Sequence, residues 1–283
     1  ADNSQMLLTI ILFLLRQESS HSFGQSLYRH SIARYLDFRI NAGKGPADND
    51  FISNFFSKIL PTPEDIGLTR FNRSSRPENY PCVKDEWATL LPSDSNDPDK
   101  VLVRQVLAKT NLEFRDLSCL YDGNLDGWKS ANFHTKVDKK GPCVVLAKSV
   151  NGGVYGGYNP TGWVNYGEFR GSIAAFLFVF PNGNTKERPI KLAKIAGAGL
   201  AQIDDGSGPK FGMEGLTIAL QSPSNKKVRS KLGLYYERLP SGSNTLFQGK
   251  SNEDELIELK VFGGIYDKDE KIPYSDAMPF SLN

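Results

Sequence analysis

The segment from Asp122 to Gly127 carries residue types that chelate calcium in an EF-hand loop. Its sequence, DGNLDG, places oxygen-bearing side chains at alternate positions and a glycine at the sixth position. The twelfth position should supply a bidentate glutamate, but Phe133 stands there. We therefore predict a turn, and a weak ion site in a calcium-responsive scaffold remains an alternative interpretation.

Nucleophilic catalysis would require a cysteine or serine beside a histidine. The chain has three histidines and three cysteines, and it contains no Gly-x-Ser-x-Gly element. Cys143 and His134 could meet in the folded chain, which leaves a redox-active or hydrolytic enzyme as an alternative. We favour a core cysteine and a surface or capping histidine, and we predict no catalytic residue and no enzymatic activity.

Two glycine segments match nucleotide-binding loops only in part. Gly249-Lys250-Ser251 resembles the end of a phosphate-binding loop, but Asn244 replaces the glycine required five residues earlier. The run Gly197-Ala198-Gly199 lacks the third glycine of a dinucleotide fingerprint. The histidines and cysteines also lack the short spacing of a zinc site. The sequence therefore predicts no cofactor and no bound metal.

The composition of the 283-residue chain limits its partners. Its 34 Lys and Arg residues against 32 Asp and Glu residues leave a net charge of +2, too small for a general polyanion binder, so nucleic acid is not expected.

Three scattered cysteines favour a reducing, cytoplasmic setting over a disulfide scaffold. The apolar run over residues 6–15 is too short to cross a bilayer, and we expect a buried helix there rather than membrane insertion.

Residues 1–110 are predicted to form a helical region, and they hold only 4 of the 26 glycines. Apolar residues recur at spacings of three and four between residues 22 and 41, and a shorter helix is expected over residues 50–59. Asp97-Pro98 has the form of an N-cap followed by proline at the first helical position. It predicts a further helix that ends near Lys109.

Residues 111–283 are predicted to form a β-rich domain. The run 143–150, the dipeptide Asn151-Gly152 and the run 154–158 predict a hairpin with a two-residue type I′ turn. Residues 173–180 suit a strand that is buried on both faces, and further strands are predicted over residues 189–195, 216–220, 232–236 and 256–262. The predicted fold class is therefore α+β, with a helical N-terminal region followed by a two-sheet antiparallel β-sandwich flanked by helices.

Glycines and aromatic residues lie close together between residues 155 and 171. Glycine on a strand lets another backbone or a large ring approach closely. We predict that Tyr155, Tyr158, Trp163 and Tyr166 pack in the interior, and an exposed aromatic recognition surface is the alternative.

From Leu120 to Gly263 the chain resembles the TLDc domain, the module of oxidation-resistance proteins and of TBC-LysM-associated domain proteins. The resemblance keeps the order of five short elements, and Trp128 and Phe262 depart from the family pattern, which indicates a divergent branch. The positions that carry the resemblance are Asp126, Gly127, Gly156, Gly157, Phe176, Phe178, Gly199, Gly215 and Glu258.

The resemblance implies a non-enzymatic protein-interaction domain with a β-sandwich fold. Family members are associated with protection against oxidative stress, and several bind the vacuolar proton-pumping ATPase. It therefore implies that this chain regulates the pump through its cytosolic sector. The expected location is the cytoplasm, with peripheral association at the vacuolar or lysosomal membrane.

Overall fold

The computed structural model describes residues 72–167, 170–195, 206–223, 225–249 and 251–275. All of them lie in one compact unit, Phe71–Asn283. The apolar run at 6–15 and the helices predicted within 22–41 and 50–59 lie outside the described residues.

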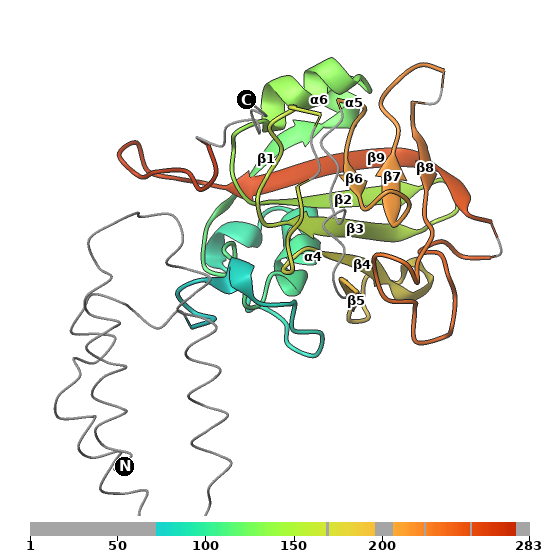
Figure 1. Ribbon diagram of the computed structural model, residues 1–283, viewed down its shortest axis with the longest axis horizontal. Coiled ribbons are helices and arrows are strands. Elements are labelled where there is room, and N and C mark those ends of the chain that lie inside the picture. Colours follow the sequence, from blue (N-terminus) through green and yellow to red (C-terminus); the bar gives the residue numbers. More distant parts are fainter. Residues whose placement is uncertain (1–71, 168–169, 196–205, 224, 250, 276–283) are drawn as a thin grey trace, which may run out of the picture. The chain divides into compact units, whose positions relative to one another are not determined.

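Nine strands and three α-helices make up the described part of the chain, together with short 3₁₀ turns (Figure 1). The helices are α4 (Pro98–Val106), α5 (Gly123–Asp126) and α6 (Ser130–Val137). The strands are β1 (Leu117–Asp122), β2 (Cys143–Ser149), β3 (Val154–Asn159), β4 (Phe176–Phe180), β5 (Ile190–Ala193), β6 (Lys210–Phe211), β7 (Leu216–Ile218), β8 (Lys227–Arg229) and β9 (Glu253–Gly264).

The strands form one antiparallel path in the order β5-β4-β3-β2-β9-β8-β7-β6, with β1 paired to β9 beside this path. The long strand β9 belongs to both halves of the path. Its first residues pair with β8, and the rest pairs with β2 on one edge and β1 on the other. Because β9 is shared, the short strands β6–β8 stay hydrogen-bonded to the larger sheet while folding over one of its faces.

Close contact between β3 and β6 shows how the two halves pack face to face. A Cβ atom on Gly157 would lie 2.8 Å from the ring of Phe211, so the absence of a side chain lets that ring rest on the strand. One buried cluster contains Phe211, Leu216 and Val228 from β6–β8 together with Val145 and Leu177 from the larger sheet. This arrangement confirms the predicted α+β class with its antiparallel sheet.

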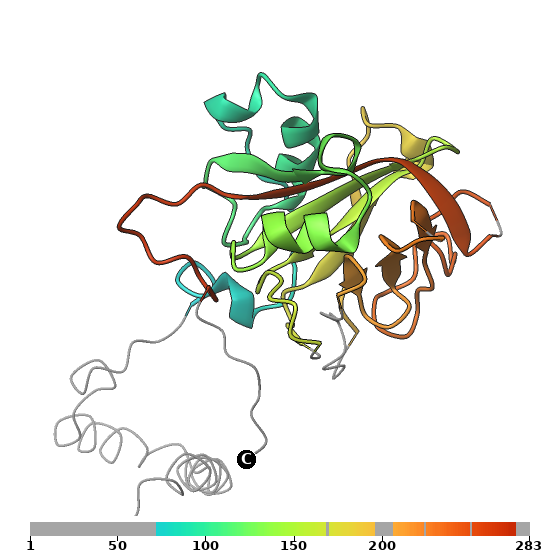
Figure 2. The same ribbon diagram turned by 90° about the horizontal axis from the view of Figure 1, so that it is seen from above.

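Helix α4 covers the opposite face of the larger sheet (Figure 2). Val103 and Val106 of the helix share a buried cluster with Val144, Phe178 and Phe262 of the strands. The side chain of Asp97 accepts hydrogen bonds from the backbone N–H groups of Asp99 and Lys100, as an N-cap does. The cap and the proline at the start confirm the helix predicted after Asp97, which ends at Val106.

Arg104 fixes the connection between α4 and β1. The side chains of Arg104 and Asp94 are fully buried, and they form a bidentate pair with N···O distances of 2.7 and 3.1 Å. The remaining guanidinium hydrogens reach the carbonyl oxygens of Leu112, Glu113 and Arg115. All five guanidinium N–H donors are thereby satisfied, which is required of a buried arginine.

The hairpin between β2 and β3 is confirmed, but its turn differs from the predicted type I′ form. Of the two turn residues only Gly152 has a positive φ, +78°, whereas a type I′ turn requires positive φ at both. The Gly152 N–H donates to the carbonyl of Ser149, and the Ser149 N–H donates to the carbonyl of Gly153. The loop therefore has three residues, with the glycine in the left-handed position of a bulge.

The prediction of a strand over residues 232–236 was wrong. The Gly233 N–H donates to the carbonyl of Tyr236, and φ of +94° at Gly233 turns the chain there. Only Tyr236 makes a β-bridge, to Lys194. The predicted strand from residue 173 begins at Phe176, because Ala174 N–H donates to the Ser172 hydroxyl in a turn.

The boundary expected at residue 110 stays a prediction. Residues of α4 pack on β2, so the described residues on both sides of that position contribute to one core.

Candidate interaction site

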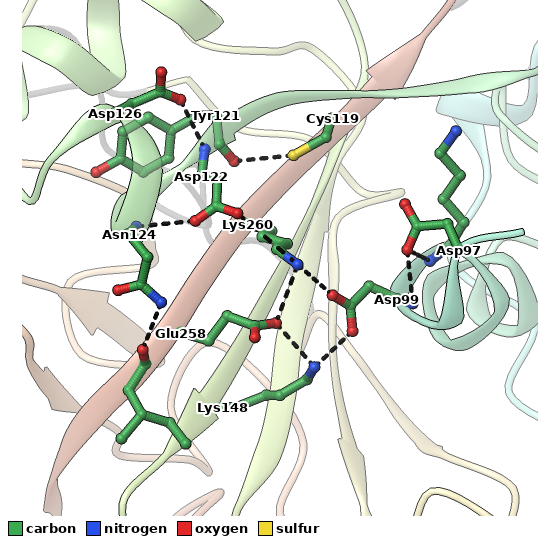
Figure 3. Close-up of polar contacts among 12 residues, drawn as sticks. Asp97, Asp99, Cys119, Tyr121, Asp122, Asn124, Asp126, Lys148, Glu258 and Lys260 are labelled. Atoms are coloured by element: carbon green, nitrogen blue, oxygen red, sulfur yellow. Dashed lines mark hydrogen bonds and ion pairs between the residues drawn. The ribbon is translucent and has the colours of Figure 1, made fainter.

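Four charged side chains form an ion-pair cluster where the first turn of α4 meets the sheet. The Nζ atoms of Lys148 and Lys260 each lie 2.6 Å from a different carboxylate oxygen of Asp99. Glu258 completes the cluster, with Oε1 2.9 Å from Nζ of Lys148 and 3.6 Å from Nζ of Lys260. Figure 3 shows both lysines reaching from the strands toward Asp99 on the helix. The cluster therefore ties α4 to β2 and β9.

Strand register brings these side chains together. Lys148 of β2 is the antiparallel partner of Glu258 of β9, and Leu146 is the partner of Lys260. Directly paired residues share a face of a sheet, and so do residues two apart on one strand. Lys148, Glu258 and Lys260 therefore all lie on the face that α4 covers.

The pKa of Asp99 and the pKa values of Lys148 and Lys260 are shifted in opposite directions. Burial by itself would raise the pKa of Asp99, but hydrogen bonds from Lys148 and Lys260 hold that pKa below its usual value. Burial would lower the pKa of Lys148 and Lys260, but the hydrogen bonds to Asp99 raise both. All three groups are therefore held in their charged forms at neutral pH.

A pocket of about 340 Å³ opens beside the cluster. Its charged lining consists of three carboxylates, those of Asp97, Asp122 and Asp126, and two ammonium groups, those of Lys136 and Lys260. Cys119, Leu120 and Leu125 complete the lining. The pocket therefore carries an excess of negative charge beside apolar side chains.

The segment that resembles half of an EF-hand loop forms α5 and its cap. The carboxylate of Asp122 accepts from the backbone N–H of Asn124 at 2.9 Å, and that of Asp126 accepts from the backbone N–H of Asp122, also at 2.9 Å. Nζ of Lys136 lies 3.0 Å from the other oxygen of Asp126. The pKa of Asp126 is lowered, first by the hydrogen bond from Asp122 and then by Lys136. Phe133, at the twelfth position, is fully buried.

Exposed apolar side chains lie on α5, where Leu125 lines the pocket, and on the neighbouring part of β9. Leu125 is 84% exposed although it belongs to α5, and Ile257 of β9 is 53% exposed. Asn124 joins the two elements, because its amide donates to the carbonyl of Ile257 at 2.9 Å and accepts from the indole of Trp128 at 3.1 Å. We call Leu125, Trp128 and Ile257, together with this pocket, the α5 surface.

The structure brings three of the family-motif positions, Asp126, Gly127 and Glu258, to this region. Asp126 lies on α5, and Glu258 belongs to the ion-pair cluster. Gly127 ends α5 with φ of +87°, a conformation that favours glycine. The remaining described positions lie in or beside the core, namely Gly156, Gly157, Phe176, Phe178 and Gly215, and Gly199 lies outside the described residues.

Cys143 and His134 have separate partners. Cys143 is fully buried, its thiol donates to the carbonyl of Gly141, and burial raises its pKa, which disfavours the reactive thiolate. Nδ1 of His134 lies 2.8 Å from a carboxylate oxygen of Asp138 in the same helix. Cys143 is therefore the expected core cysteine, whereas His134 is buried rather than the surface histidine that was predicted, because α6 packs its last turn against the core.

Of the four aromatic residues expected in the interior, Tyr155, Tyr158 and Trp163 are almost completely buried. Tyr166 lies over Nζ of Lys139 and is only partly buried. The exposed apolar side chains of the site are instead Leu125 and Ile257, which sequence reasoning missed together with Asp99, Lys148 and Lys260. The N-cap at Asp97 was the one local signal, because it placed Asp99 in the first turn of a helix.

Two further observations concern the described residues alone. They hold no group of three or more histidine, cysteine, aspartate and glutamate side chains arranged for a metal ion. Among them, no helix combines the length and apolar character needed to span a membrane.

Comparison with known protein families agrees with the resemblance found in the sequence. The family model of the TLDc domain matches residues 98–253, more than half of the chain, and the match starts at the first residue of α4. The full sequence has no significant match among curated proteins. Because the family model spans α4 and the strands from β1 to the start of β9, the chain belongs to the TLDc domain family.

Proposed function

We propose that this chain is a non-enzymatic protein-interaction domain that regulates the vacuolar proton-pumping ATPase by binding its cytosolic sector. The observation that carries the proposal is membership of the TLDc domain family. Members of that family are associated with the pump and with protection against oxidative stress. Binding to the pump would place the chain in the cytoplasm, at the surface of the vacuolar or lysosomal membrane.

The geometry of the site supports binding rather than catalysis. The carboxylates of Asp99, Asp122 and Asp126 are engaged by lysines or by backbone N–H groups. A general base or nucleophile would need an available group close to a substrate. The one fully buried thiol, that of Cys143, is held in its protonated form by burial. Exposed leucine and isoleucine side chains beside charged groups are instead typical of a contact surface.

Affinity purification from a native extract tests the proposal. The full chain serves as bait, and an unrelated domain of similar size and near-zero net charge serves as the control. We expect cytosolic-sector subunits of the pump to be retained by the chain and to be absent from the control. Absence of pump subunits from the chain, with some other protein abundant, would contradict the proposal.

A peroxide-survival assay separates binding from the enzyme alternative. Cells that depend on this chain for protection would express the Cys143→Ala or the His134→Ala variant. We expect survival equal to that with the unmodified chain, provided that both variants accumulate normally. Loss of protection with a folded variant would instead favour a redox-active or hydrolytic enzyme.

A further inference from the structure

The α5 surface has apolar side chains that contribute little to the stability of the chain itself. Leu125 and Ile257 are 84% and 53% exposed, so each leaves most of its apolar area in water. Exposing apolar area costs about 25 cal/mol for each Å². Exposed apolar side chains gathered beside a half-buried tryptophan are characteristic of sites where another protein docks.

Trp128 and Asn124 of this surface have partners within the chain before any other protein binds. The indole of Trp128 lies against Gly123, where an added Cβ would come within 3.0–3.2 Å of the ring. Nζ of Lys226 lies 5.1 Å from the centre of the indole, and the amide of Asn124 links the indole to the carbonyl of Ile257. Side chains that are already held in place lose little entropy on binding, and for Trp128 and Asn124 this favours affinity.

The adjacent pocket defines the charge of the partner. Leu125 lines it together with three carboxylates and only two ammonium groups. One of these ammonium groups, that of Lys260, lies 2.6 Å from Asp99 and 3.9 Å from the nearer oxygen of Asp122. The Asp122 carboxylate therefore has this longer ion pair and the hydrogen bond from the backbone N–H of Asn124, and its remaining lone pairs face the pocket that it lines. A guanidinium or ammonium group entering the pocket would find an oxygen acceptor and a favourable field, whereas a phosphate would be repelled.

We propose that the α5 surface docks a basic, amphipathic segment of a protein partner. A lysine or arginine of that segment enters the pocket beside Asp97 and Asp122, and a neighbouring apolar side chain packs on Leu125 and Ile257. The inference rests on the proposed function, because it names the surface through which this interaction domain binds. Charge complementarity selects the occupant, since the same pocket disfavours an anionic membrane or a nucleic acid.

Selection from a random library of 12-residue peptides tests the inference with the full chain as target. We expect the selected peptides to carry lysine or arginine next to leucine, isoleucine or phenylalanine. Their affinity should fall as salt concentration rises, because the ionic part of the contact is screened. Selected peptides without a basic residue, or no enrichment at all, would overturn the proposal.

Leu125→Lys and Ile257→Lys are the variants that locate the binding surface. Each replaces an exposed apolar contact by a cation, and we expect at least about tenfold weaker binding of the selected peptides. Leu234→Lys is the matched control, because Leu234 is 57% exposed, lies outside α5 and β9, and does not line the pocket. It should bind as the unmodified chain does. Equal binding by all three variants would contradict the proposal, and unchanged circular dichroism would show that each is folded.

The same variants separate this inference from the proposed function. Pump subunits retained equally by the chain and by Leu125→Lys would leave the proposed function standing and overturn the docking surface. If no pump subunit binds but the selected peptides bind and are lost in Leu125→Lys, the docking surface stands and the proposed partner is wrong. Self-association that Leu125→Lys abolishes would mean that a second copy occupies the surface, which would also overturn the proposal.

Discussion

The two faces of the larger sheet are stabilised by different interactions. On the face covered by β6–β8, large apolar side chains interlock, and Gly157 makes room for the ring of Phe211. On the face covered by α4, buried charges accompany the apolar contacts. The buried aspartate, arginine and lysine residues of the described chain all lie on this second side, namely Asp94, Asp99, Arg104 and Lys191.

The difference shows which part of the molecule is specified by shape and which by charge. Apolar packing between two sheets depends on the volumes of the side chains that meet, and it does not favour charged side chains at the contact. Buried ion pairs hold α4 in one position, because an unpaired charge in that environment would be strongly unfavourable. Lys260 and Glu258 lie at the edge of this face, and Lys260 also lines the pocket of the α5 surface. The candidate site is therefore an extension of the charged face.

Replacement of Arg104 should have the largest effect on the α4 side. Arg104→Ala leaves the carboxylate of Asp94 buried without its partner, and three carbonyl groups lose their donors. We expect a loss of about 4 kcal/mol in the free energy of unfolding, measured by urea denaturation. Arg104→Lys should recover little of it, because a single ammonium group cannot make five directed hydrogen bonds. A loss below about 1 kcal/mol would show that this pair does not hold the α4 side.

Adding a methyl group at Gly157 tests the face of the sheet that β6–β8 cover, where apolar side chains interlock. Gly157→Ala places Cβ 2.8 Å from the ring of Phe211 and 3.0 Å from Leu177, and we expect a loss of about 2 kcal/mol by overpacking. The double variant with Phe211→Leu should be less destabilised than the sum of the two single variants, because the smaller side chain leaves room for the methyl group. Additive effects would mean that the two positions do not interlock.

Asp99→Asn should have a smaller effect that depends on pH. The variant removes the negative charge shared by Lys148 and Lys260, and we expect a loss of about 2 kcal/mol at pH 7. The folded-state pKa of Asp99 lies below its ordinary value of 3.8. Its stabilisation is therefore fully present above that ordinary value and is lost as pH falls through the lower, folded-state pKa. Urea denaturation of both chains at pH 7 and pH 3 should show the difference shrinking in acid. A constant difference would contradict this assignment.

Cysteine labelling compares the core with the α5 surface in the folded chain. Cys119 is exposed on β1, and burial of part of its side chain with Asp122 nearby raises the pKa of its thiol to about 11. In a Cys82→Ser background, Cys119 should react with a maleimide in the native chain, at a rate that rises with pH between 8 and 10. Cys143 should react only after urea is added, as followed by mass spectrometry. Equal labelling rates of Cys119 and Cys143 in the native chain would show that the core around Cys143 opens readily.

Local patterns predicted several elements correctly because their determinants lie within a few residues. The Asp97-Pro98 pair opens α4, and the β-prone runs on both sides of Asn151-Gly152 form β2 and β3. The turn type was missed because a one-residue change in the hairpin register converts the two-residue loop into a three-residue one. Strand β8 was missed because three residues, alternately exposed and buried, give too short a pattern to recognise.

By itself, the sequence determined the α+β class, the start of α4, the central hairpin and membership of the TLDc family. These features depend on capping, periodicity and short motifs, which act over a few residues. Only the tertiary structure placed Asp99 against Lys148 and Lys260, which are 49 and 161 residues away along the chain. The pairing of β2 with β9 sets that meeting, and the folding of α5 onto β9 places Asn124 beside Ile257. Long-range strand register leaves little trace in any local segment, because it depends on which distant edges bury the most apolar area together.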